Sequence, residues 1–440
     1  MGGRILRLVL GAAFFIGPMG SGRGGGIVWS DRPAGDRSIR ASGFDGSGVR
    51  TLVSGLGDPR GVAIDVAGGV VYFTDRQGGT ATSGELNSVP LGGGARAQFL
   101  GQLNRPADLR FEPGSRALYW CEENAGLIRR AEVPDSGEGW VAAVVFSGIA
   151  SPYFLDLDAA RGGMVWGTSG SSLHRGPLAG GIPDPPMYTA GQNMRGVGID
   201  PDAGMVYWVE RDGARAIRRR PLDGGGPIED VYTGLDTPHG LVLDVVARRL
   251  YWVDTGSQNA GGFNPRGVSR GHMDGSAVEA AEIVVAGTPS NQPWDIDLDP
   301  RASSYGEWIR RFFRFDADAG RTAPLADPDG DGLNNFGEYA LGGAPMTAAS
   351  SGTLEAGLME EGGVVHVIFT HLERAEAPDI AYEVEESRDL KSWGQGQKWE
   401  VWRREPADTQ GMERVTRRRA ISGGDTGGHF RVHVATVAGG

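Results

Sequence analysis

The chain has 440 residues, with 74 glycines, one cysteine and a formal net charge of −12 at neutral pH. This length allows two or three domains, the glycine content suits many tight turns, and the acidic balance argues against a nucleic-acid partner. Cys121 has no second cysteine to pair with and lies inside a hydrophobic strand, so we expect a buried, inert thiol. Extracellular modules of eukaryotes usually carry disulfides, which favours a bacterial exported protein.

Residues 1–26 predict a signal peptide or a disordered leader. Arg4 and Arg7 precede the apolar run 8–16, and small residues continue to Gly26. This order of charged, apolar and small residues is typical of export, so we expect a secreted, periplasmic or cell-surface location. The apolar run is too short to span a bilayer comfortably, and the sequence offers no other transmembrane candidate.

A short signal recurs six times: an aromatic pair, or a variant of it, ends a hydrophobic strand. The pairs are Val28-Trp29, Tyr72-Phe73, Tyr119-Trp120, Val165-Trp166, Tyr207-Trp208 and Tyr251-Trp252. Their second residues are 44, 47, 46, 42 and 44 positions apart. A period in this range, with alternating strands and Gly-rich turns, predicts a β-propeller with one four-stranded blade per repeat. We expect the aromatic side chains to fill the core and the acids after them to cap strand ends.

A second repeated segment indicates how the ring closes. Each pair from the second onward follows a strand that starts with proline, or once with Met194, and ends in an acidic turn; these strands are 58–65, 105–112, 151–158, 193–200 and 237–244. A sixth segment, 292–299, has no aromatic pair after it, and the first pair has no such segment before it. Pairing 292–299 with the strands at 27–54 would complete a blade and leave no open edge. We therefore predict an all-β protein with a six-bladed propeller at residues 27–300.

The repeats resemble the YWTD (class B) repeats of the low-density-lipoprotein receptor propellers. The resemblance lies in Tyr72-Phe-Thr-Asp75, Tyr119-Trp-Cys-Glu122, Tyr207-Trp-Val-Glu210 and Tyr251-Trp-Val-Asp254, and in Leu222-Asp-Gly224 and Met273-Asp-Gly275. Blade four departs from it, because Val165-Trp-Gly-Thr168 lacks the tyrosine and the acid. The receptor propellers bind proteins and do not catalyse, so the resemblance implies a binding module with a protein or peptide partner.

The segment 327–338 predicts one calcium site. Acids stand at loop positions 1, 3, 5 and 12, and glycine stands at position 6. This is the spacing with which a calcium loop turns oxygens toward one cation. The predicted ligands are Asp327, Asp329, Asp331, the carbonyl of Leu333, Asn335 and Glu338. The loop resembles dockerin and thrombospondin type 3 repeats, but dockerins carry two copies, so cohesin binding is not implied.

Residues 301–348 predict a calcium-stiffened connector, with a helix at 305–313 and a short helix at 336–341. Residues 349–440 predict a small sandwich-like β domain, with strands at 364–369, 381–385, 399–402, 414–417 and 430–435. The phrase 382–393 resembles C-terminal β domains of large secreted bacterial proteins. That resemblance implies a structural or cell-surface role.

No nucleophile elbow, HExxH helix or phosphate-binding loop occurs, so no catalytic residue is assigned. Aligning the proline-started segments places a ring of side chains at one mouth of the channel. The candidate ligand-binding residues are Arg60, Tyr153, Arg195, His239 and Trp294, and one step further Asp108 and Asp295. Such a ring can bind an anionic or aromatic group through charge-assisted hydrogen bonds and stacking. It is equally consistent with Arg60 and Arg195 pairing with neighbouring carboxylates, such as Asp108 and Asp295, across the channel.

Three functions remain open. The first is a secreted or surface-attached protein whose propeller recognises a protein, a peptide or an anionic carbohydrate. The second is a propeller enzyme of the calcium-dependent lactonase or hydrolase type, for which Asp108 and Asp295 would serve as channel acids. The third is a structural spacer of a surface layer or matrix.

Overall fold

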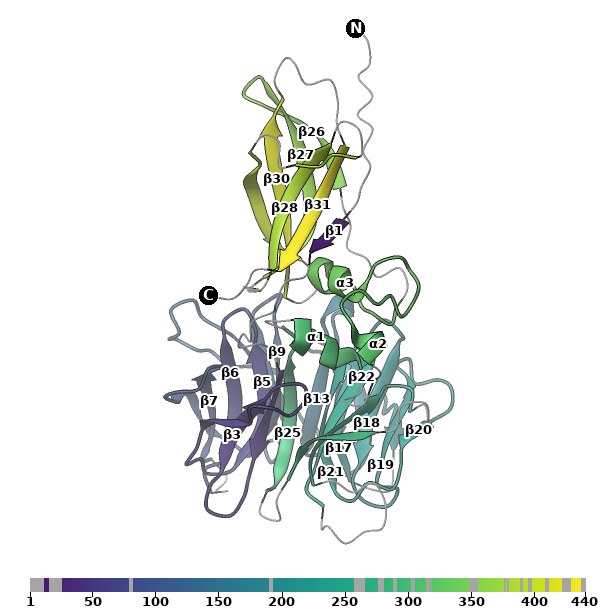
Figure 1. The fold of residues 1–440 in the computed structure, drawn as a ribbon. Coiled ribbons are helices and arrows are strands. Elements are labelled where there is room, and N and C mark those ends of the chain that lie inside the picture. The colour runs from purple at the N-terminus through teal and green to yellow at the C-terminus, as the bar shows by residue number, and fades with distance from the viewer. Residues whose placement is uncertain are drawn as a thin grey trace. The chain divides into compact units, whose positions relative to one another are not determined.

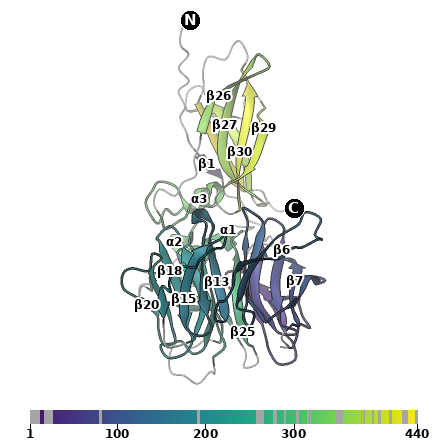
Figure 2. The same ribbon diagram turned by 180° about the vertical axis from the view of Figure 1, so that it is seen from behind.

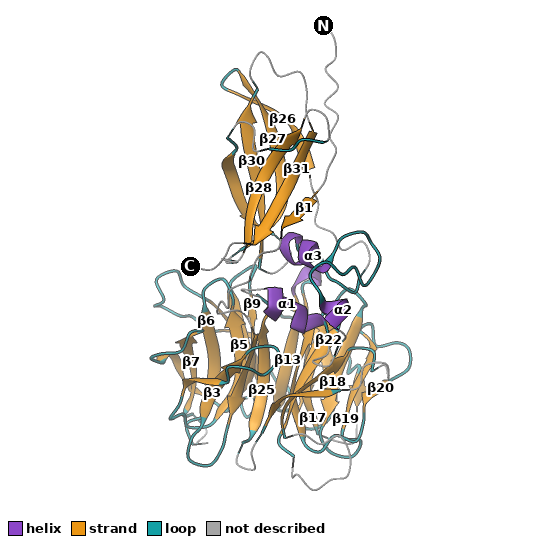
Figure 3. Ribbon diagram, in the orientation of Figure 1, coloured by secondary structure: helices purple, strands orange, loops and turns teal. Residues whose placement is uncertain are grey.

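The computed structural model describes residues 12–15, 26–78, 82–189, 193–256, 266–275, 281–287, 291–301, 305–313, 317, 319–347, 355–375, 377, 380–387, 391–394, 398–407, 411–421 and 429–436. Strands dominate these residues, and Figure 3 shows a few short helices among them. Gly26–Asp299 forms one compact unit, and Pro300–Gly440 with an N-terminal strand forms a second. Among the described residues, no helix has the length and apolar character that a membrane span requires.

The first unit contains six four-stranded antiparallel sheets. Five are continuous in sequence. They comprise β5 (Pro59–Asp65), β6 (Val70–Asp75), β7 (Gly84–Pro90) and β8 (Ala97–Leu103); β9 (Pro106–Glu112), β10 (Ala117–Glu122), β11 (Leu127–Glu132) and β12 (Ala143–Phe146); β13 (Pro152–Asp158), β14 (Gly163–Thr168), β15 (Ser172–Pro177) and β16 (Tyr188–Thr189); β17 (Met194–Asp200), β18 (Met205–Glu210), β19 (Ala216–Pro221) and β20 (Glu229–Tyr232); and β21 (Pro238–Asp244), β22 (Arg249–Asp254), β23 (Gly267–His272) and β24 (Glu282–Ala286). A 3-10 turn, Ala159–Arg161, joins β13 to β14.

The sixth sheet joins the two ends of the repeat array. Its order is β25 (Pro293–Asp299), β2 (Gly26–Asp31), β3 (Ser38–Ser42) and β4 (Arg50–Val53). Strand β25 runs antiparallel to β2, with Asp299 opposite Gly26. Figure 1 shows the green β25 beside the purple strands from the start of the chain, and Figure 2 shows the teal blades from behind. The six-bladed propeller and its predicted mode of closure are confirmed.

The repeated aromatic residues form the wedges between neighbouring blades. Trp120, Trp166, Trp208 and Trp252 are fully buried. Rings of the outermost strands cover two of them, with Tyr188 at 5.1 Å from Trp208 and Tyr232 at 5.2 Å from Trp252 between ring centroids. Burying such large side chains contributes a major part of the hydrophobic stabilisation of each blade.

The acidic residues that follow the aromatic pairs connect each blade to the loop before it, because their carboxylates accept backbone N–H groups of that loop. The carboxylate of Asp75 accepts the backbone N–H groups of Gly57 and Asp58 at 2.9 and 2.6 Å. The carboxylate of Asp254 accepts those of Thr237 and Gly256 at 2.9 and 2.8 Å. The predicted capping role is confirmed at these two positions.

The first strand of each blade lies innermost, and these six strands contact one another in a closed ring. The approach is close enough to require glycine. A Cβ on Gly196 would lie 2.6 Å from the backbone nitrogen of Leu241, and one on Gly240 would lie 2.6 Å from the Cα of Asp295. Each inner strand also shifts register against its neighbour near its proline end. Such bulges change the direction in which a side chain points, here at the channel mouth.

The second unit combines short helices with two sheets. The helices are α1 (Tyr305–Phe312), α2 (Ala319–Thr322) and α3 (Asn335–Leu341). One sheet has the order β26 (Glu355–Glu361), β27 (Val364–Arg374), β30 (Met412–Ala420) and β29 (Glu400–Pro406). The other has the order β1 (Ala12–Phe15), β31 (His429–Thr436) and β28 (Ile380–Ser387). The sequence predicted the five strands β27–β31 and the helices α1 and α3, but not β26 or β1.

Two findings modify the expected organisation of this unit. Strand β1, from within the predicted leader, pairs in parallel with β31; the remaining residues up to Gly25 lie outside the described residues, and removal of the leader stays a prediction. The helix α3 packs against the β domain, since Arg374 Nε donates to the carbonyl of Tyr339 and the Tyr382 hydroxyl donates to that of Ala340. The expected boundary at residue 348 therefore runs through one packed unit.

Candidate functional site

The predicted mouth residues come together at the proline ends of the inner strands. The guanidinium of Arg60 lies 4.0 Å from the ring centroid of Trp294, and that of Arg195 lies 4.6 Å from the ring of Tyr153. The two aromatic rings are 6.3 Å apart between centroids. Strands β5, β13, β17 and β25 thus supply two cation–aromatic pairs that lie side by side. Stacking of this kind holds a guanidinium flat against the ring while its N–H groups stay directed to the sides.

Two arginines that the alignment did not select complete this group. Arg32 lies 4.7 Å from the Trp294 ring, and Arg76 lies 5.5 Å from the Tyr153 ring. Both directly follow the acid of a repeat motif, at Asp31 and Asp75. That position holds Arg32, Arg76, Glu123, Ser169, Arg211 and Thr255 in the six blades. Aligning the repeats at this position, in addition to the proline-started segments, would have identified Arg32 and Arg76 as candidates. We refer to Arg32, Arg60, Arg76, Arg195, Tyr153 and Trp294 as the arginine mouth.

The arginine mouth carries more positive than negative charge. Asp58 forms ion pairs with Arg32 and Arg60, and Glu123 forms one with Arg76 at 2.9 Å. Arg195 donates to the backbone carbonyl of Met194 at 2.7 Å, and its Nε has no hydrogen-bond partner. Within the described part of the chain, no carboxylate lies within ion-pair distance of Arg195. Its charge is therefore the least compensated of the four.

Burial lowers the pKa of Arg60, Arg76 and Arg195, and repulsion from neighbouring arginines adds to the effect. An arginine guanidinium nevertheless keeps its charge in proteins. Burial raises the pKa of Asp58, whereas the ion pairs with Arg60 and Arg32 lower it. The combined effect of the two arginines is larger, so the pKa of Asp58 lies below its ordinary value. Asp58 thus stays ionised, and the excess positive charge persists across the neutral pH range.

His239 belongs to the mouth as an aromatic residue and not as a cation. Its side chain is buried, and its ring centroid lies 4.0 Å from that of Trp294. Burial lowers its pKa well below the ordinary value, and Arg211, Arg195 and Arg60 lower it further. The imidazole is therefore neutral and supports the Trp294 ring from the side.

Asp108 and Asp295 do not belong to the mouth, and we remove them from the candidate site. Both are buried deeper in the channel, where Arg110 donates to Asp108 at 2.7 Å and lies 3.4 Å from Asp295. The second oxygen of Asp108 accepts the backbone N–H of Leu155 on the next inner strand, and the same Asp295 oxygen that faces Arg110 also accepts the backbone N–H of Val62. In the alternative interpretation Arg60 and Arg195 pair with neighbouring carboxylates: Arg60 does so with Asp58, whereas Asp108 and Asp295 pair with Arg110.

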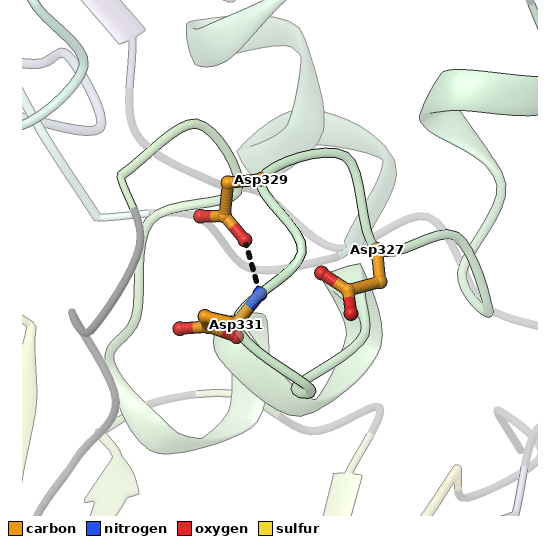
Figure 4. A group of neighbouring side chains, drawn as sticks. All are labelled: Asp327, Asp329 and Asp331. Carbon is orange, nitrogen blue, oxygen red and sulfur yellow. Dashed lines mark hydrogen bonds between the residues drawn. The ribbon is translucent and has the colours of Figure 1, made fainter.

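The predicted calcium loop brings three of its six ligands together. Carboxylate oxygens of Asp327, Asp329 and Asp331 lie within 4.8 Å of one another, and Figure 4 shows them on one loop between α2 and α3. Positive φ angles at Gly330 and Gly332 allow the sharp bend, and Asp327 accepts the N–H groups of both glycines. Partial burial, with repulsion from Asp331 and Asp327, raises the pKa of Asp329. Three hard oxygen donors that repel one another are suited to Ca²⁺.

The residues of the other three predicted ligands make the following contacts. Glu338 is fully buried in the first turns of α3. Asn335 directs its amide N–H₂ to the carbonyls of Arg321 and Ala323 at 2.8 and 2.9 Å, which ties the loop to α2. The backbone N–H of Leu333 donates to Asp331 at 2.8 Å. The carboxylates of the three aspartates form the cluster, and the amide nitrogen of Asn335 ties the loop to α2; binding of calcium by the six predicted ligands stays a prediction.

Comparisons with known proteins agree with the propeller. No family model matches the chain. The low-density lipoprotein receptor-related protein 1 of Pyricularia oryzae is 26% identical over 205 residues, which cover 38% of this chain and 62% of that protein. A chain of the crystal structure of a nidogen/laminin complex superposes with a TM-score of 0.51 at 16% identity, covering 62% of this chain and 98% of its own length. TolB from Acinetobacter baumannii has a TM-score of 0.45 at 12% identity, covering 62% and 66%.

These comparisons establish the fold and a limited sequence likeness. The chain spans 62% of the length of the curated relative that it matches. At 16% identity the structural likeness concerns the propeller alone. Residues 26–299 therefore form a β-propeller similar to low-density-lipoprotein-receptor-related repeats, and activity and partners have to be argued from the site.

Proposed function

We propose that this protein is a secreted or cell-surface binding protein whose arginine mouth recognises an anionic group of a protein or peptide partner. The observation that carries the proposal is Arg195, a charged side chain stacked on Tyr153 at 4.6 Å and without a carboxylate at ion-pair distance in the described residues. Desolvating a cation without a counter-ion is costly, and an anionic ligand would offset that cost.

The shape of the mouth favours a carboxylate or a similar planar anion. Arg60 and Arg195 each lie over an aromatic face, so the rings fix the guanidinium planes. A fixed guanidinium binds a carboxylate through two parallel N–H donors, which a lysine ammonium cannot do. An acidic peptide side chain therefore fits best, and the carboxylate of an acidic sugar is the second form of the same chemistry.

Calcium has a separate role in this proposal. We infer that Ca²⁺ binds between Asp327, Asp329 and Asp331 and stiffens the loop that leads into α3. The carbonyls and carboxylates of the loop supply the hard oxygens that this ion requires. The ion would act on the stability of the second unit and not on recognition by the propeller.

The lactonase alternative receives less support from the channel. A catalytic cation there would need several converging oxygen ligands. Asp108 and Asp295 converge on the guanidinium of Arg110 instead. Within the described residues, three metal-ligating side chains gather at the Asp327 loop and at no other place.

The proposal can be tested by a thermal-shift screen of the intact chain against acidic peptides and sugar acids, with neutral peptides and sugars as reference. Saturable stabilisation by an acidic ligand, lost in the double variant Arg60→Ala/Arg195→Ala, is the expected result. We expect at least a 10-fold loss of affinity, since one hydrogen bond to a charged group contributes about 1.5–3 kcal/mol.

The matched control is Arg130→Ala. Arg130 lies on β11 and forms a solvent-exposed ion pair with Glu132. Its removal changes the net charge of the chain in the same direction without touching the arginine mouth. The assignment of the arginine mouth is wrong if Arg60→Ala/Arg195→Ala binds the acidic ligand as tightly as Arg130→Ala does. It is also wrong if neutral ligands stabilise the chain as much as acidic ligands do.

A further inference from the structure

The channel contains a cavity away from the arginine mouth. It has a volume of about 200 Å³ and lies toward the acidic ends of the inner strands β9, β13, β17, β21 and β25. None of the six residues that define the arginine mouth lines it. Its walls are of mixed polarity: they include the apolar side chains of Phe111, Leu157, Val197, Ile199, Leu241 and Leu243 beside four charged residues. A site here would be separate from the one in the proposed function.

Two carboxylates, Asp156 and Asp297, line this cavity and are held in place by neighbouring strands. One oxygen of Asp156 accepts the N–H of Ile199 at 2.7 Å, and one oxygen of Asp297 accepts that of Ile64 at 2.8 Å. The other oxygen of Asp156 lies 3.8 Å from Arg110 Nε, which is too far for a hydrogen bond. Its side chain keeps 25% of its surface accessible. A fixed and accessible carboxylate oxygen thus faces an apolar space.

The charges around the cavity do not balance. Arg110 is the cation of its lining, and it already donates a hydrogen bond to Asp108 at 2.7 Å. Asp108, Asp156, Asp295 and Asp297 all act electrostatically on this one guanidinium. Carboxylates in a poorly solvated space require positive partners or protons. Burial raises the pKa of Asp156 and Asp297, so a bound cation competes with protons at these two carboxyls. A cation that carries a hydrocarbon body would contact both the carboxylates and the apolar side chains of the lining.

We propose that this cavity binds a primary alkylammonium group, with the ammonium at Asp156 and Asp297 and the aliphatic chain along Leu157, Val197 and Leu241. The free amine and the lysine side chain share this chemistry. The volume corresponds to roughly six or seven water molecules, which suits a chain of about four to six carbons. A bare metal ion fits less well, because among the described residues three metal-ligating side chains converge at the Asp327 loop and not in this cavity.

The test is a calorimetric titration of the intact chain with butylammonium and with Nα-acetyl-lysine methylamide. Butanol, which has the same hydrocarbon body without the charge, serves as the reference ligand. Saturable binding of butylammonium at least 10-fold tighter than butanol is expected. Binding of both amines would mean that the cavity admits a lysine side chain, and binding of butylammonium alone would restrict it to free amines.

The variants Asp156→Asn and Asp297→Asn should each weaken amine binding at least 10-fold. In Asp156→Asn the amide oxygen can still accept the N–H of Ile199, whereas Asp297 accepts the N–H groups of both Ile64 and Leu298, of which the asparagine keeps one. Glu112→Gln is the matched control, because Glu112 lines the same cavity but directs its carboxylate to the N–H groups of Gly114 and Ser115. Unfolding curves of all three variants check that each one folds. Two variants at different strands keep the test valid if one of them fails to fold.

The pH dependence gives an independent readout. The charged residues that line the cavity are Arg110 and Glu112 on β9, Asp156 on β13 and Asp297 on β25, of which Glu112 directs its carboxylate to the N–H groups of Gly114 and Ser115. Strands β17 and β21 contribute apolar side chains. Burial raises the pKa of Asp297 to about 7, so amine binding should strengthen as the pH rises from 6 to 8. Equal binding of butanol, no effect of Asp156→Asn and Asp297→Asn, or no saturation would overturn the proposal and leave a cavity that holds water only.

Discussion

Arg110 donates a hydrogen bond over 2.7 Å to Asp108, two residues earlier on the same inner strand, and both side chains are buried. The same nitrogen lies 3.4 Å from Asp295 on β25, the strand that closes the ring. Asp108 in turn accepts the backbone N–H of Leu155 on β13. One guanidinium thus connects three inner strands. Burial alone would lower the pKa of Arg110, but Asp108, Asp295 and Asp156 together raise it, so the residue remains charged.

Arg110→Met should destabilise the propeller strongly, by about 3–5 kcal/mol, because it leaves two carboxylates buried without their cation. Urea unfolding of the intact chain measures the effect. Arg130→Met, which removes an exposed arginine, should cost less than about 1 kcal/mol. Adding Asp108→Asn and Asp295→Asn to Arg110→Met should restore part of the loss. A loss at Arg110 no larger than that at Arg130 would contradict the connecting role.

The stability of the propeller should fall as the pH rises from about 4 to 8. Burial raises the pKa of Asp297 to about 7 and that of Asp254 to about 6, from 3.8 in the unfolded chain. The folded state therefore binds more protons in this window, so the stabilisation is complete below pH 3.8 and is lost as the pH rises through 6 and 7. We expect a change of about 4–7 kcal/mol if these two groups dominate, measured as the urea midpoint at each pH.

Asp297→Asn should flatten this pH profile, since it removes the group that titrates near neutrality. Asp202→Asn, at an exposed turn position, is the control and should reproduce the wild-type profile. A profile of Asp297→Asn with the slope of the wild type would show that other groups cause the pH dependence.

Gly196→Ala should destabilise the inner ring, because the new Cβ would lie 2.6 Å from the backbone nitrogen of Leu241 and 2.7 Å from the carbonyl of His239. Backbone atoms cannot move aside easily, so a cost of about 1–3 kcal/mol is expected. Gly92→Ala, where no heavy atom lies within 4 Å, should be nearly neutral. Equal unfolding midpoints for the two variants would rule out the close approach of β17 and β21.

Calcium should stabilise the second unit through the Asp327 loop. At a concentration of 100 times the dissociation constant, the gain is about 2.7 kcal/mol, which a melting curve with calcium and with chelator would measure. Asp329→Asn should remove most of the response, because it takes away one of three converging carboxylates. Asp135→Asn, an exposed aspartate of the propeller, should keep it. A calcium response that survives Asp329→Asn would place the ion elsewhere.

The sequence was sufficient for the fold because each blade repeats the same local pattern. Trp208 and Trp252 mark equivalent strands, and the unmatched segment 292–299 has a single complementary partner at the start of the chain. A repeat of this kind specifies its neighbours without knowledge of side-chain contacts. Closure could therefore be deduced from the order of the segments.

The site was only partly predictable, because pairing within a channel depends on three dimensions. Aligning the repeats places Arg60 and Arg195 at equivalent positions. The alignment cannot show that Asp108 pairs with Arg110 and not with Arg60. Both Asp108 and Arg110 face the channel since they are two residues apart on one strand, which alternation could have indicated. Strand β1 was missed because its parallel pairing with β31 joins segments more than 400 residues apart.

The most direct test of the central claim is a calorimetric titration of the intact wild-type chain and of Arg195→Ala with the best acidic peptide from the screen, at low and at high salt. Saturable binding that weakens with salt, and that is at least 10-fold weaker in Arg195→Ala, is the result expected for an arginine mouth that recognises an anion. Equal affinity of the two proteins for every acidic ligand would contradict this function.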